Sequence, residues 1–107
     1  MIQGGGYIAL EFACIFAGLG SDVTVIYRGD NILRGFDDDV RAHVRAEMKK
    51  DGITLLTGCT VDKIEKHGDE YTSHLSNGSS IASDKVMFAI GRHPNVANLG
   101  LEKAGVA

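Results

Sequence analysis

Residues 4–9 read Gly4-Gly5-Gly6-Tyr7-Ile8-Ala9. This run fits the pattern G-x-G-x-x-G/A, in which small residues allow a tight turn, the approach of a phosphate to the backbone, and close packing of a helix on a strand. Residues 7–17 are apolar and rich in Ala, so a helix should begin at the glycines and end at Gly18 or Gly20. Its first N–H groups and its positive dipole end would face a pyrophosphate. A purely structural glycine turn is the alternative.

The segments that follow alternate between strand and helix. Residues 23–27 are apolar and β-branched, which is typical of a strand buried on both faces of a parallel sheet. Asp37 can cap a second helix that Gly52 ends, and residues 53–57 form the next predicted strand. This order favours a parallel sheet with right-handed crossovers.

The second half of the chain has a different pattern. Residues 61–65 and 71–75 are separated by a turn, and a second turn leads to Ile81, which predicts an antiparallel meander. Residues 86–90 are continuously apolar and should return to the buried sheet. The sequence therefore predicts an α/β fold, a Rossmann-like parallel sheet with an antiparallel β-meander.

Composition limits the class of protein. A chain of 107 residues with 44% hydrophobic residues suits one domain with one core. The net charge of -3, with no long basic run, argues against nucleic acid or an anionic membrane and favours a small-molecule partner. The apolar run 7–19 contains Glu11 and is too short to span a bilayer, so we expect a cytoplasmic, soluble protein. Cys14 and Cys59 lack metal-site spacing and are expected to be free thiols, with no metal site and no catalytic role.

The residue type at the end of the strand predicted at residues 23–27 indicates which nucleotide binds. About twenty residues after such a glycine pattern, NAD and FAD sites usually carry an acid. This chain has Arg28 there, and Arg34 lies six residues later. A guanidinium can bind a 2′-phosphate that a carboxylate would repel, which favours NADP over NAD or FAD. Solvent-exposed arginines without a ligand are the alternative, and Asp30 is either a displaced ribose acceptor or a turn former.

Three motifs carry a resemblance to a family. They are residues 4–13 (GGGYIALEFA), 27–37 (YRGDNILRGFD) and 89–95 (AIGRHPN). Together they resemble the glutathione reductases of bacterial and plant type, within the pyridine nucleotide-disulfide oxidoreductases, over nearly the whole chain. The resemblance implies that residues 1–107 form the NAD(P)-binding domain, with 92–107 beginning the link back to a flavin domain. It implies NADPH here, and FAD at a site in the parent enzyme outside this chain.

Residue roles follow from the same resemblance. Tyr7 is similar to a tyrosine that covers the nicotinamide pocket, and Glu11 to a glutamate that pairs with a lysine beside the flavin. Glu11 is the lone charge on an apolar helix, so we expect a buried acid whose partner lies outside the chain, with a partly exposed side chain as the alternative. The expected cofactor-binding residues are Gly4, Gly5, Gly6, Tyr7, Ile8, Ala9, Glu11, Arg28, Arg34, Ile90 and Gly91.

The resemblance implies an electron path from NADPH to FAD, to a cysteine pair and then to oxidised glutathione, in a homodimeric parent enzyme. Trypanothione reductases are similar too, but have a longer connection than residues 18–22, so glutathione is favoured. A non-enzymatic nucleotide-binding module is the alternative class. No redox cysteine pair or FAD glycine motif is present, so the chain alone is expected to be inactive.

Two departures from the family pattern have consequences. The family often has a second basic residue where this chain has Gly29, which should weaken 2′-phosphate binding. Only residues 1–3 precede the glycines, so the first strand is expected to be truncated. We expect the fragment to self-associate or to be only marginally stable as a result.

Overall fold

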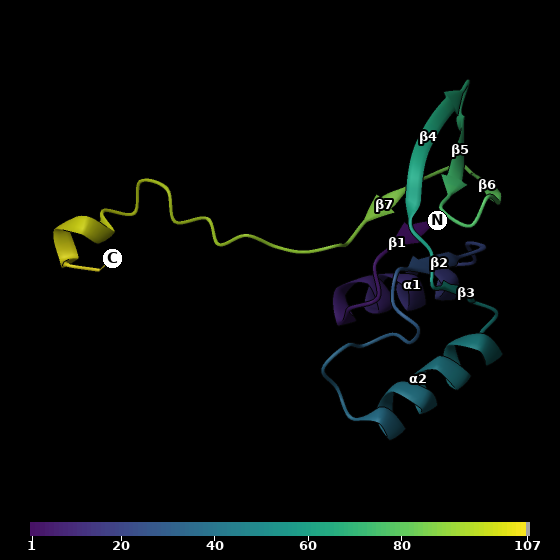
Figure 1. Cartoon of the computed structure of the whole chain (residues 1–107), viewed down its shortest axis with the longest axis horizontal. Coiled ribbons are helices and arrows are strands. Elements are labelled where there is room, and N and C mark those ends of the chain that lie inside the picture. Colours follow the sequence, from purple (N-terminus) through teal and green to yellow (C-terminus); the bar gives the residue numbers. More distant parts are fainter. Residues whose placement is uncertain (107) are drawn as a thin grey trace.

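The computed structural model describes residues 1–106, which form an α/β fold with two sheets (Figure 1). The parallel sheet has the order β3-β2-β1-β7, and the antiparallel sheet has the order β4-β5-β6. The elements are β1 (Ile2–Gln3), α1 (Tyr7–Gly18), β2 (Thr24–Tyr27), α2 (Asp38–Lys50), β3 (Thr54–Thr57), β4 (Val61–His67), β5 (Glu70–Leu75), β6 (Ser80–Ser83), β7 (Met87–Phe88) and the 3-10 helix η1 (Leu101–Ala104). The predicted fold class is confirmed.

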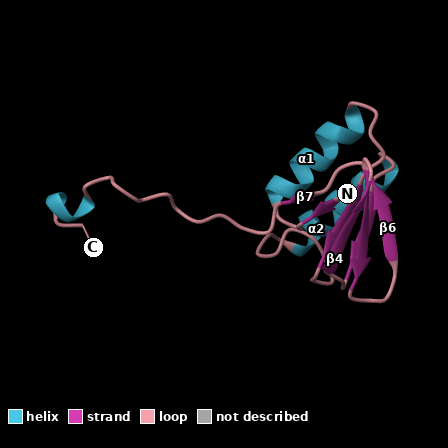
Figure 2. Cartoon of the chain, turned by 90° about the horizontal axis from the view of Figure 1, so that it is seen from above, coloured by secondary structure: helices cyan, strands magenta, loops and turns pink. Residues whose placement is uncertain are grey.

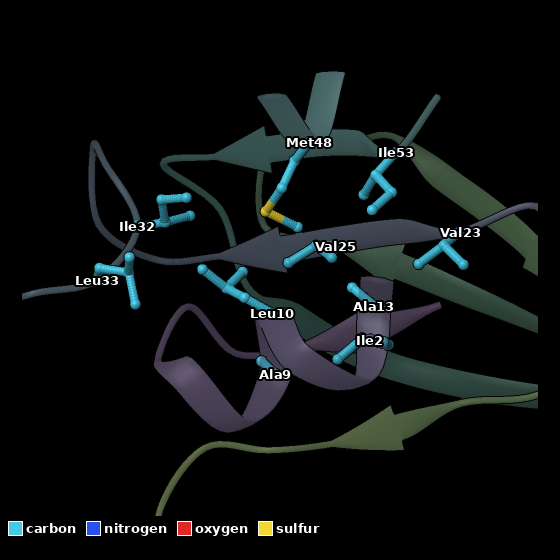
Figure 3. Packing of buried hydrophobic residues seen from close by; sticks show 10 residues of the cluster. All are labelled: Ile2, Ala9, Leu10, Ala13, Val23, Val25, Ile32, Leu33, Met48 and Ile53. Carbon is cyan, nitrogen blue, oxygen red and sulfur yellow. The ribbon is translucent and has the colours of Figure 1, made fainter. Parts of the chain in front are cut away.

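The parallel sheet lies between the two helices and the meander. Val25 and Ile26 are adjacent on β2 and fully buried, and they point to opposite faces of the sheet because side chains alternate along a strand. Val25 packs with Leu10 of α1 and Met48 of α2 (Figure 3). Ile26 packs with Leu75 of the meander. Burial of β2 on both faces explains its continuous apolar sequence.

β1 is short but central. Ile2 pairs with Val25 on one side and with Met87 on the other. The Ala89 N–H donates to the Gln3 carbonyl at 2.8 Å. This bond and the pairing of Ile2 with Met87 join β7 to the rest of the sheet. The two residues of β1 therefore join β2 to β7 within the sheet.

The prediction of a buried strand over residues 86–90 is wrong in extent. Only Met87 and Phe88 form β7, and Phe88 and Ile90 are 51% and 70% exposed. β7 has only β1 as a hydrogen-bonded neighbour in the described part of the chain, so it pairs only where that short strand runs. Beyond residue 91 the backbone leaves the folded body as an extended arm that ends in η1 (Figure 2).

The helices begin where the sequence predicts. α1 starts directly after the glycines and ends at Gly18. Asp37 caps α2, because its Oδ1 accepts a 2.9 Å hydrogen bond from the Asp39 N–H. Among residues 1–106, no helix has the length and apolar character needed to cross a bilayer. Cys14 is exposed and Cys59 buried, and both are free thiols.

Candidate dinucleotide-binding site

An open cavity of about 850 Å³ lies at the carboxyl ends of β1, β2 and β7. It is lined by residues 3–8, 26–28 and 87–92 and by Thr60. The chain runs from β1 outward to β2 and β3, and then returns to place β7 on the other side of β1. The strand order therefore reverses beside β1, and such switch points are where open α/β sheets bind ligands.

The glycines of the turn serve different purposes. A Cβ on Gly4 would lie 2.3 Å from the Ala89 carbonyl oxygen and 3.2 Å from the Ala9 Cβ, and Gly4 has a φ of 147°. Gly4 is therefore required by the close approach of α1 and of the residue directly after β7. A Cβ on Gly6 would meet no atom within 4 Å. Packing within this chain does not require glycine at position 6, whereas a ligand approaching the backbone there would.

The amino end of α1 is left without an internal cap. Its N-cap residue is Gly6, no side chain accepts from its first N–H groups, and its first turn contains no acid. α2 provides the contrast, with a capping Asp37 followed by two further aspartates. The free N–H groups and the positive dipole end of α1 therefore face the cavity at Gly6, Tyr7 and Ile8, where they can bind an anion.

Eight of the eleven predicted residues line the cavity. They are Gly4, Gly5, Gly6, Tyr7, Ile8, Arg28, Ile90 and Gly91. Ala9 does not line it, because this side chain is buried beneath the turn. Arg34 is exposed on the loop after β2 and outside the lining. Within residues 1–106, neither Arg28 nor Arg34 forms an ion pair.

Glu11 is expected to be a buried acid whose partner lies outside the chain, and because the chain alone leaves it exposed, that expectation stays a prediction. Its side chain is exposed on the face of α1 that points away from the sheet, and it does not line the cavity. Phe12 and Ile15 are exposed on α1 as well, so an apolar sequence did not mean burial there. The helix buries only the face that carries Ala9, Leu10 and Ala13.

Two arginines that the sequence reasoning missed hold the loop between Arg28 and Arg34. Arg41 Nε donates to the Ile32 carbonyl at 2.8 Å, and its Nη2 donates to the Asn31 carbonyl at 3.1 Å. Arg45 Nη1 donates to the Asp30 carbonyl at 3.0 Å. The four-residue spacing places both arginines on one face of α2, which is the only sequence signal for this role. Their acceptors are backbone carbonyls, which no residue type reveals.

A separate polar cluster crosses the antiparallel sheet, outside the cavity lining. Glu65 Oε1 accepts from Lys63 Nζ at 2.6 Å, and Glu65 Oε2 lies 2.7 Å from His74 Nε2. Ser80 Oγ lies 2.9 Å from His74 Nδ1. The hydrogen bond from Lys63, and then the one with His74, lower the pKa of Glu65 to about 2.

The parallel sheet, the glycine turn and the uncapped helix at the switch point define a Rossmann-like α/β fold. The family model for the pyridine nucleotide-disulphide oxidoreductases matches residues 1–107. The chain therefore belongs to this family, whose members bind small-molecule dinucleotides.

Individual relatives agree with the family assignment. The chain is 48% identical over 105 residues to a glutathione reductase from Burkholderia cepacia and 45% identical over 107 residues to a trypanothione reductase from Leishmania donovani. These matches cover 98% and 96% of this chain but only 23% and 22% of the relatives. An engineered water-forming NADPH oxidase bound to NADPH has a similar structure, with a TM-score of 0.82 and 29% identity, over 95% of this chain and 22% of its own.

Proposed function

We propose that this chain is the NADPH-binding domain of a flavoprotein that reduces glutathione disulfide. The observation that carries the proposal is the placement of two anion-binding features on one cavity. The uncapped amino end of α1 faces the cavity at Gly6, and the guanidinium-bearing Arg28 lines it at the end of β2. A dinucleotide phosphate offers an anion to each of them.

The residues present fit the two ends of NADPH. The first turn of α1 would hold the pyrophosphate, and Arg28, with Arg34 on the same loop, would hold the 2′-phosphate. The engineered NADPH oxidase supports this assignment. Its substitutions include two to arginine, six positions apart, and the aspartate directly before the first was replaced by alanine. Arg28 and Arg34 have the same spacing.

At the other end of the cavity, Tyr7, Ile90 and Gly91 would surround the nicotinamide. NADPH supplies a hydride, and this chain would bind and orient the donor. In the parent enzyme FAD and a cysteine pair would accept the electrons, with residues 92–107 linking this domain to the flavin domain. We propose that the parent is a cytoplasmic homodimer, and that Glu11 meets its partner in that assembly.

This chain by itself should not reduce a disulfide. Cys14 lies on α1 and Cys59 follows β3, and they are not paired. An assay of NADPH oxidation with FAD and oxidised glutathione should therefore show no turnover, and steady turnover by the purified chain would contradict this part of the proposal. Trypanothione in place of glutathione is the second candidate substrate, and it is distinguished by assaying the full-length protein with both disulfides.

Calorimetric titration of the chain with NADPH, NADH and FAD tests the proposal directly. We expect NADPH to bind more tightly than NADH, and Arg28→Ala to remove the difference. Lys49→Ala, an exposed cation at the end of α2, is the matched control and should change nothing. Equal affinity for NADPH and NADH would contradict the assignment of the 2′-phosphate. Tighter binding of FAD would instead indicate a flavin-binding role.

A further inference from the structure

We infer that Tyr27 determines how many cations the proposed 2′-phosphate site can hold. Its ring is clamped between Gly5 and Gly29 and excludes a side chain at position 29, directly after Arg28. The inference rests on the proposed function for the identity of the ligand. The clamping of the Tyr27 ring between the two glycines can be tested without any ligand.

The ring lies against the backbone of both glycines. A Cβ on Gly5 would lie 2.4 Å from the Tyr27 Cγ and 2.5 Å from its Cδ2. A Cβ on Gly29 would lie 2.7 Å from the Tyr27 Cε1 and 3.2 Å from its Cζ. Both pairs of distances are shorter than carbon atoms in contact allow, which is about 3.5 Å or more. The inner part of the ring therefore occupies the space beside Gly5, and its outer part occupies the space beside Gly29.

Backbone conformation does not explain these two glycines. The positive-φ glycines of the chain, such as Gly4 and Gly58, do not include Gly5 or Gly29. A residue with a Cβ could adopt the backbone at both positions. The Tyr27 ring is therefore the reason that glycine is needed there.

The ring cannot easily move aside, because hydrogen bonds fix the backbone around it. The Gly5 carbonyl accepts from the Leu33 N–H at 2.7 Å, and the Gly29 carbonyl accepts from the Gly58 N–H at 3.1 Å. The carbonyl of Tyr27 itself accepts from the Cys59 N–H at 3.3 Å. Tyr27 also lines the cavity, so moving its ring outward would place it in the space for the ligand.

This clamp has a consequence for specificity. Position 29 follows Arg28 at the carboxyl edge of the sheet, where a lysine could add a second charge-assisted hydrogen bond to a 2′-phosphate. The ring of Tyr27 excludes that side chain, so discrimination between NADPH and NADH depends on Arg28 and Arg34. A smaller residue at position 27 should release position 29 for a second cation.

A double-mutant cycle of Tyr27→Val and Gly29→Ala tests the clamp by thermal melting. When Tyr27 is present, we expect Gly29→Ala to destabilise the chain by overpacking. Each kcal/mol of lost stability should lower the melting temperature by about 4–8 °C. In the Tyr27→Val background the same change should cost much less. Tyr27→Phe keeps the ring and should preserve the full penalty. Tyr27→Leu replaces Tyr27→Val if the latter does not fold. Additive effects would overturn the clamp.

The specificity half is tested by adding Gly29→Lys to the Tyr27→Val background and titrating with NADPH and NADH. The preference for NADPH should rise by about tenfold relative to Tyr27→Val alone. An unchanged preference, with a non-additive melting cycle, would overturn the specificity role and leave only a packing role. If the unmodified chain bound neither nucleotide, the proposed function would fail, while the melting cycle would still decide whether the clamp exists.

Discussion

The backbone N–H of Leu33 donates a 2.7 Å hydrogen bond to the carbonyl oxygen of Gly5, and this bond joins the loop after β2 to the glycine turn. Leu33 has a φ of 55°, a left-handed conformation that is uncommon for residues other than glycine. Its side chain is buried in the main core beside Leu10 and Ile32 (Figure 3). Burial of the Leu33 side chain therefore holds the loop after β2 against the glycine turn. In the proposed function, the glycine turn would bind the pyrophosphate and the loop would bind the 2′-phosphate.

Gly4→Ala and Gly6→Ala should separate folding from binding. A Cβ at position 4 meets the Ala89 carbonyl, so Gly4→Ala should lower the free energy of unfolding by about 1–3 kcal/mol or more. A Cβ at position 6 stands in open space, so Gly6→Ala should preserve stability and weaken NADPH binding. Urea unfolding and calorimetry check the pair. Unchanged stability in Gly4→Ala, or unchanged affinity in Gly6→Ala, would contradict the roles given to these glycines.

Arg28→Ala should weaken NADPH much more than NADH. A hydrogen bond to a charged group contributes about 1.5–3 kcal/mol, so the loss should be about tenfold to 150-fold in affinity for NADPH. Arg34→Ala should have a smaller effect, because Arg34 does not line the cavity. Titrations of both nucleotides at two salt concentrations measure this, since a charge contact weakens as salt rises. Parallel losses for NADPH and NADH would show that Arg28 does not contact the 2′-phosphate.

Arg41→Ala should weaken NADPH binding although Arg41 does not line the cavity. It removes two hydrogen bonds to carbonyls of the loop between Arg28 and Arg34, at Asn31 and Ile32. We expect a stability loss of about 1–3 kcal/mol, together with reduced affinity. Asp38→Asn breaks the exposed ion pair to Arg41, removes one acid from the first turn of α2, and keeps both hydrogen bonds from Arg41 to the loop. It is the matched control, with an expected cost below about 1 kcal/mol. Full affinity in Arg41→Ala would show that the loop needs no support from α2.

Glu65 should make a pH-dependent contribution to stability. Its pKa is about 2 in the folded chain, below its ordinary value of 4.5, so the folded state favours the ionised form. The stabilisation is therefore fully present above about pH 4.5 and is lost as the pH falls toward 2. Comparison of the unfolding of the unmodified chain and Glu65→Gln across this range should show a difference that shrinks with acid. A difference that stays undiminished as the pH falls through 2 would refute the assignment.

The chain should self-associate as its concentration rises. β3 and β7 each have one hydrogen-bonded neighbour in the described part of the chain. Phe12 and Ile15 on α1, and Leu19 directly after it, expose apolar surface. Ile15→Lys should reduce association, whereas Val40→Lys, at an exposed position on α2, should not. Light scattering across a concentration series, with thermal melts, measures this. A monodisperse monomer with concentration-independent melting would show that these surfaces do not recruit a second copy.

Signals within single elements predicted the fold well. The glycine run, the Asp37 cap and the β-branched segment of β2 each report local backbone preferences, and the helices and the central strand formed as expected. The cavity at the carboxyl ends of the strands follows from the same topology, which is why most of the predicted residues line it.

The features that the sequence did not reveal are relations between distant segments. The exposure of Glu11 depends on which face of α1 the sheet covers, and the length of β7 depends on the two residues of β1. The ties from Arg41 and Arg45 end on backbone carbonyls, and the clamp on Tyr27 depends on the absence of a Cβ at two glycines far apart in sequence. Apart from the four-residue spacing of Arg41 and Arg45, these relations leave no periodic or compositional signal.

The hydrogen bonds from α2 to the loop couple ligand binding at the loop to the local unfolding of α2. When α2 opens, the carbonyls of Asp30, Asn31 and Ile32 lose their donors, and the loop that carries Arg28 and Arg34 loses its support. By thermodynamic reciprocity, a ligand that holds this loop must suppress the opening of α2 by the same factor. Amide hydrogen exchange in α2, a helix outside the cavity lining, therefore becomes a remote reporter of occupancy at the carboxyl edge of the sheet.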